Sequence, residues 1–74
     1  MSNIDILTES ITQEVIGFLM ADNKIELDEA MSILYNSELF DKINDVETGL
    51  YLEGSAYVYE LLKDELTKDI QTKN

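Results

Sequence analysis

The sequence contains no cysteine, histidine, proline or tryptophan. Without cysteine the chain forms no disulfide bond and offers no thiolate ligand to a metal, which fits the reducing cytoplasm, where we expect the protein. Without histidine it lacks the commonest general base and the commonest transition-metal ligand. These absences argue against an enzyme and against a transition-metal site.

Positive charge is scarce as well. Five basic residues, all of them lysine, stand against 16 acidic residues, and the net charge is −11. This excess repels phosphate backbones and anionic lipids, so we expect no binding to nucleic acid or to a membrane surface. No apolar run approaches the roughly 20 residues of a membrane-spanning helix, and the N-terminus lacks the pattern of a signal peptide. The acidity has two interpretations: a solvated surface, or a surface complementary to a basic partner.

Helical periodicity is the main pattern that is present. Apolar residues recur every three or four positions in residues 4–23, 27–36 and 55–69, which predicts three helices. A chain of 74 residues makes one small domain. We therefore expect an all-α fold, a small bundle of three main helices plus a short helical turn, with antiparallel neighbours where the links are short. Residues 1–3 and 71–74 are expected to fray.

The link between the second and last predicted helices carries turn signals. Ser37 suits the N-cap of a short helix over residues 38–44, although the second helix has the alternative of continuing straight through it. Gly49 can adopt a positive φ, and Asp45 can bond its own nearby backbone. For Gly49-Leu52 we expect an extended connection with Leu50 and Leu52 on one side. The alternative is a β pairing of this segment with a second chain.

Gly17 interrupts the apolar pattern of the first helix, and we interpret it as a point of close approach by another helix. The periodic apolar positions predict the core. Its expected members are Leu7, Ile11, Val15, Phe18, Leu34, Leu39, Phe40, Ile43, Leu50, Leu52, Val58, Leu61, Leu62 and Leu66.

No motif of catalysis or metal binding emerges. Acidic pairs are plentiful, but at their spacings most, Glu65 among them, fall on exposed helix faces and are interpreted as solvated charge. The three glycines share no phosphate-loop spacing. The residues around Gly49 do not match the calcium-binding loop of an EF-hand. Val46 and Thr48 occupy ligand positions, and Ser55 stands where a bidentate glutamate is required. We expect no catalytic residue, no metal ligand, no cofactor and no small-molecule substrate.

Tyrosines are the candidate partner contacts, because such side chains are enriched at interface centres. We single out Tyr51, Tyr57 and Tyr59. On a helix Tyr57 and Tyr59 lie about 200° apart, so the two should not be equally buried. The alternative is that the tyrosines edge the domain's own core, which has no tryptophan to fill it.

Three segments carry a resemblance: 35–40, 45–52 and 55–62, with the block Glu-Thr-Gly-Leu-Tyr at 47–51 as its most specific part. They resemble a group of short uncharacterised acidic helical proteins of Gram-positive and gut bacteria, over residues 29–65. The start of the last helix, Glu53-Gly54, departs from the Gln-Ser-Pro-like pattern expected for that group. The resemblance implies an antitoxin-like protein or an accessory partner of a larger neighbour, and it carries over no functional residue.

Together these features predict a cytoplasmic, non-catalytic protein–protein interaction module. A homodimer is one form of it, because a small core gains from burying further apolar surface. The alternative is an antitoxin-like or inhibitor protein that sets its acidic face against a basic partner.

Overall fold

The computed structural model describes residues 3–72, and the side chains of residues 3–68. Within this range it has four α-helices, two 3-10 turns and no strand: α1 (Asn3–Asn23), α2 (Leu27–Tyr35), α3 (Glu38–Asn44), η1 (Val46–Thr48), η2 (Leu50–Leu52) and α4 (Ser55–Thr72). The predicted all-α bundle is confirmed. Two helices are longer than predicted, since α1 begins at Asn3 and α4 continues to Thr72. The other residues of the expected frayed ends, 1–2 and 73–74, lie outside the described residues.

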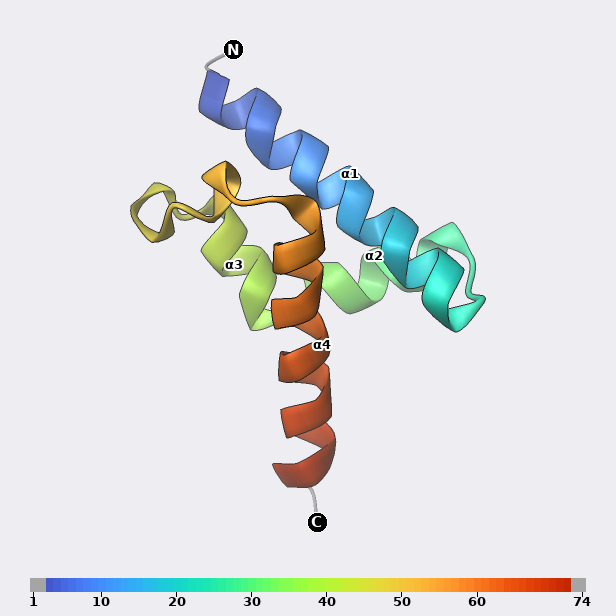
Figure 1. The fold of residues 1–74 in the computed structure, drawn as a ribbon. Helices are drawn as coiled ribbons and strands as arrows, with labels where there is room; N and C mark the ends of the chain where they lie inside the picture. Colours follow the sequence, from blue (N-terminus) through green and yellow to red (C-terminus); the bar gives the residue numbers. More distant parts are fainter. Residues whose placement is uncertain (1–2, 73–74) are drawn as a thin grey trace.

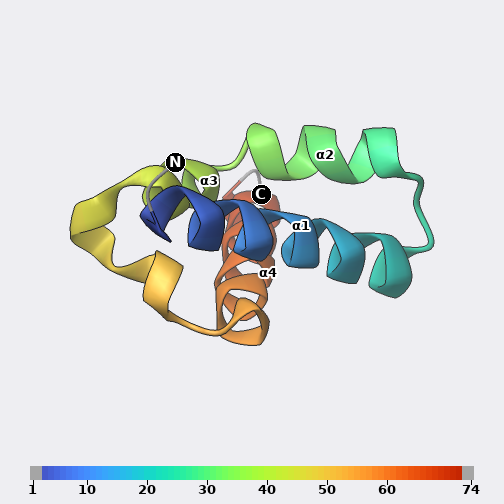
Figure 2. The same cartoon turned by 90° about the horizontal axis from the view of Figure 1, so that it is seen from above.

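The remaining elements pack around α1, which contacts α2, α3, α4 and η2. Figure 2 shows α2 running back beside α1 in the opposite direction, as the short link between them predicts. The α4 helix crosses α1 near its own N-terminal end, and its C-terminal part projects away from the other helices (Figure 1).

The first link is closed by a left-handed residue. Lys24 has a φ of 53°, and the Ile25 N–H donates to the Met20 carbonyl at 3.3 Å. This is the Schellman pattern that satisfies carbonyls at a helix end. Asn23, the residue before Lys24, donates its side-chain amide to Leu19 O at 3.0 Å.

Ser37 separates α2 from α3, as predicted, so the alternative of one continuous helix is wrong. Its Oγ accepts a hydrogen bond from the Phe40 N–H at 3.2 Å and donates to Leu34 O at 2.6 Å. The side chain thus serves the end of one helix and the start of the next, and it is buried.

The turn after α3 follows the prediction up to Gly49 and then departs from it. Gly49 has a φ of 69°, and Asp45 Oδ1 accepts from the Glu47 N–H at 3.0 Å. The extended connection predicted for residues 50–52 is wrong: the Leu52 N–H donates to Gly49 O at 3.0 Å, which closes a 3-10 turn. About 120° separates successive residues in such a turn, so Leu50 and Leu52 do not share a face. Residues 50–52 are therefore not an extended strand, which the alternative of β pairing with a second chain requires.

Each helix contributes side chains to one core. The fully buried large residues are Val15, Leu19, Leu34, Ile43, Val58 and Leu62. Three predicted core members, Leu7, Phe18 and Leu52, are exposed instead. Four hydrophobic residues outside the predicted core are buried as well: Ile16, Leu19, Ala30 and Tyr59. For Ile16 the cause is that α1 contacts α2, α3 and α4, which buries a wider stripe than one helix face.

Gly17 does not mark a close approach, contrary to the prediction. It is exposed, and a Cβ placed on it would meet no atom of another element within 4 Å.

Candidate protein-interaction surface

The predicted contact Tyr59 belongs to the core. Only 6% of it is exposed, and its hydroxyl donates to Asp22 at 2.8 Å. The centroids of the Phe18 and Tyr59 rings are 5.3 Å apart. The Lys63 Nζ atom lies 5.1 Å from the centroid of the Tyr59 ring and also pairs with Glu60 at 2.9 Å. Burial raises the pKa of the Tyr59 phenol above its usual value of 10.0, and the hydrogen bond to the Asp22 carboxylate and the charge of that group raise it further. Tyr59 therefore holds α4 against α1, and its buried side chain offers little surface to a partner.

The other two predicted contacts differ from each other. Tyr57 is 53% exposed, so the prediction that Tyr57 and Tyr59 are unequally buried is confirmed. Tyr51 is half-buried and packs against the core. Leu52, which is 71% exposed, precedes the link Glu53-Gly54, and Tyr57 follows it in the first turn of α4; both leave apolar surface in water.

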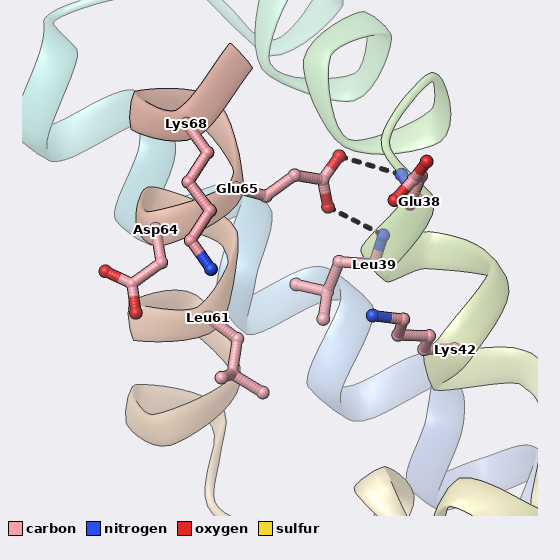
Figure 3. Close-up of a pocket in the computed structure, with 7 residues that line it drawn as sticks. All are labelled: Glu38, Leu39, Lys42, Leu61, Asp64, Glu65 and Lys68. Carbon is pink, nitrogen blue, oxygen red and sulfur yellow. Dashed lines mark hydrogen bonds between the residues drawn. The ribbon is translucent and has the colours of Figure 1, made fainter. Parts of the chain in front are cut away.

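A groove of about 280 Å³ lies between α3 and α4. In Figure 3 the Glu65 side chain extends from α4 toward the start of α3, and Lys42 and Lys68 approach from the two helices. The Glu65 carboxylate accepts hydrogen bonds from the backbone N–H groups of Glu38 at 2.8 Å and Leu39 at 2.9 Å. These are donors that a helix leaves unpaired at its N-terminus.

Glu65 is therefore not the solvated charge that the sequence predicts. With both oxygens bonded to the α3 backbone, its carboxylate joins two helices. Sequence reasoning missed it because its bonding partners are 26 and 27 residues away, and no local pattern signals the contact.

A second groove, which we call the aromatic groove, lies between α1 and the junction of α2 and α3. Tyr35, Phe40, Ile16 and Glu9 line it together with neutral polar residues. The Tyr35 and Phe40 rings are 4.8 Å apart between centroids and inclined at 53°. Tyr35 is 45% exposed, and Phe40 is half-buried.

Local chain geometry makes this ring pair. On one continuous helix, side chains five residues apart point about 140° away from each other. The break at Ser37 redirects the chain, so the end of α2 and the first turn of α3 bring Tyr35 and Phe40 together. From the sequence, Phe40 is expected in the core, and Tyr35 is not among the expected contacts.

Among the described residues, no group of three or more acidic, histidine or cysteine side chains is arranged to hold a metal ion. None of the helices within residues 3–72 is long and apolar enough to cross a membrane.

Comparison with known proteins identifies no relative: no family model, no curated protein and no solved structure matches the chain. The resemblance to short acidic helical proteins of Gram-positive bacteria therefore stays a prediction.

Proposed function

We propose that this protein is a non-catalytic protein–protein interaction module whose partner is basic. The observation that carries this proposal is the exposure of large apolar side chains on a chain of net charge −11: Tyr57 and Tyr35 are 53% and 45% exposed. Half-exposed tyrosines supply contact area at interface centres, and the charge speeds encounter with a cationic surface. The cytoplasm is the compartment that we propose, because the chain has no cysteine.

The test is co-purification from the native cell, followed by binding of the purified partner at increasing salt. A basic partner should bind more weakly as salt rises, because salt screens the attraction. Tyr57→Ser should weaken the complex further at every salt concentration, since it removes apolar contact area and leaves the charge unchanged. Recovery of only acidic partners, or a complex that salt does not weaken, would contradict the proposal.

An antitoxin-like protein or an inhibitor of a basic enzyme is the more specific form of this function, and the acidity together with the sequence resemblance supports it. If the partner is a toxin or a nuclease, co-expression of this chain should relieve its effect on growth. If a basic partner binds and its activity does not change, the inhibitor proposal is contradicted, and the proposal of a general interaction module stands.

Self-association is the second candidate, and the exposure of Leu52 and Tyr57 favours it. Salt should affect self-association in the opposite direction from binding to a basic partner. Two copies, each of charge −11, repel one another, so salt should strengthen a homodimer. Light scattering at low and high salt distinguishes the two candidates, and a strict monomer at high concentration removes the homodimer.

A further inference from the structure

The aromatic groove combines features that suit a cation rather than an apolar side chain alone. One wall is the exposed ring of Tyr35, whose centroid lies 4.8 Å from that of the Phe40 ring. Glu9, the one charged side chain among the described residues that line it, is negative. A ring face and a carboxylate attract the same group, a cation with an apolar stem.

Two polar residues of the groove, Asn44 and Thr12, present acceptor oxygens. Asn44 donates its Nδ2 hydrogen to Phe40 O at 2.9 Å, and Thr12 donates its hydroxyl hydrogen to Thr8 O at 2.8 Å. The Asn44 Oδ1 and the Thr12 lone pairs are not used in these bonds. Acceptors beside a carboxylate favour a cation with several N–H donors, and the aromatic wall favours the planar guanidinium over an ammonium.

The size of the groove fits one side chain. Its volume is about 240 Å³, below the roughly 300–1,000 Å³ of small-molecule sites. Ile16, at 7% exposure, gives it an apolar lining that can cover the methylene stem of a long side chain.

We propose that the aromatic groove is the subsite that receives an arginine side chain of the basic partner. The guanidinium stacks on Tyr35 and is paired by Glu9, while the net charge of −11 steers the partner toward this surface. This inference rests on the proposed function, because it assigns the place where a basic partner is recognised.

The experiment measures binding of three peptides by calorimetry and by amide chemical shifts: nona-arginine, nona-lysine and nona-citrulline. Citrulline keeps the shape of arginine and lacks its charge. Nona-arginine should bind more tightly than nona-lysine, because the planar guanidinium stacks on a ring better than an ammonium does. The largest shifts should fall at Tyr35, Phe40 and Glu9. Nona-citrulline should not bind.

Four variants separate the groove from diffuse charge. Glu9→Gln and Glu14→Gln change the net charge equally, but Glu14 is an exposed α1 residue outside the groove. Glu9→Gln should weaken nona-arginine binding about threefold more than Glu14→Gln does. Tyr35→Leu should weaken it about twofold to fivefold and remove the preference for arginine over lysine, whereas Tyr35→Phe should retain both. Thermal unfolding verifies that each variant is folded.

Each contrary result has a defined meaning. If Glu9→Gln and Glu14→Gln weaken nona-arginine binding equally and Tyr35→Leu does not change it, the groove is not the arginine subsite. The proposed function would then depend on diffuse charge alone. Binding of nona-citrulline as tight as that of nona-arginine would overturn the cation site. Absence of any peptide binding at low salt would also overturn it, whereas the proposed function fails only if co-purification yields no salt-sensitive basic partner.

Discussion

Replacing Glu65 by glutamine removes the charge from a carboxylate that joins two segments far apart in the chain. In the wild type both oxygens accept backbone N–H groups of α3, from Glu38 at 2.8 Å and Leu39 at 2.9 Å. Glutamine offers one acceptor oxygen, and its NH₂ group faces a second backbone donor. One of the two bonds is lost, and the attraction between a negative charge and the start of a helix is lost with it.

The size of the effect follows from where the two bonds lie. A hydrogen bond to a charged group contributes about 1.5–3 kcal/mol, and loss of a helix N-cap costs about 0.5–2 kcal/mol. The bond to Glu38 is exposed, so water can replace it, whereas the bond to Leu39 is partly buried. We expect Glu65→Gln to lower the free energy of unfolding by about 1–2 kcal/mol and Glu65→Ala by about 2–3 kcal/mol. For a domain whose total is on the order of 5 kcal/mol, each kcal/mol lowers the Tm by about 4–8 °C.

The assay is urea unfolding followed by circular dichroism, with Asp64→Asn as the matched control. Asp64 is the preceding residue, it is exposed, and the substitution changes the net charge by the same amount. The control should remain within about 0.5 kcal/mol of wild type. Amide hydrogen exchange adds a local readout, because the Leu39 N–H should exchange faster in Glu65→Gln. If Glu65→Gln is as stable as Asp64→Asn, the carboxylate does not hold α3, and the reasoning is refuted.

Four further substitutions test the core and α1. Because the pKa of Tyr59 is raised in the folded state, its contribution to stability is complete below pH 10.0 and is lost as the pH rises through the folded-state value. Tyr59→Phe should therefore flatten the alkaline loss of unfolding free energy, at a cost near neutral pH of about 1 kcal/mol from the hydrogen bond to Asp22; an unchanged alkaline slope in urea titrations would contradict this. Leu62→Ala, at a fully buried position, should destabilise by about 2–5 kcal/mol in urea unfolding, and Leu61→Ala, half-buried, by less. Equal losses would show that the α4 face is misassigned. Gly17→Ala should raise the free energy of unfolding by about 1 kcal/mol, because alanine is the better helix former and the site is open; a drop in Tm would show a contact there after all.

The features that were predicted correctly are those with short-range causes. The break at Ser37 depends on a side chain that bonds the backbone three residues away on either side. The turn at Gly49 depends on one residue's freedom to adopt a φ of 69°, and Asp45 bonds the backbone two residues on. Helical periodicity indicated the helices because every third or fourth residue meets the same neighbour.

The same reasoning failed wherever a neighbour distant in sequence decides the environment. Leu52 is the exception with a local cause: it fits an alternating pattern, but the 3-10 turn closed by its N–H bond to Gly49 O leaves it in water. Phe18 has the right helical phase for burial but is 37% exposed at the edge of α4, where its ring stacks on that of Tyr59.

Sequence alone determined the helical class, the places where the chain turns, and the acidity on which the proposed partner depends, because each follows from residue type and from interactions within a few positions. The tertiary structure alone decided which tyrosine is buried, that Glu65 bonds the start of α3, and that Tyr35 and Phe40 form one groove with α1. These outcomes depend on how the helices pack against one another. Packing sums many contacts between distant residues, and no short stretch of sequence records them.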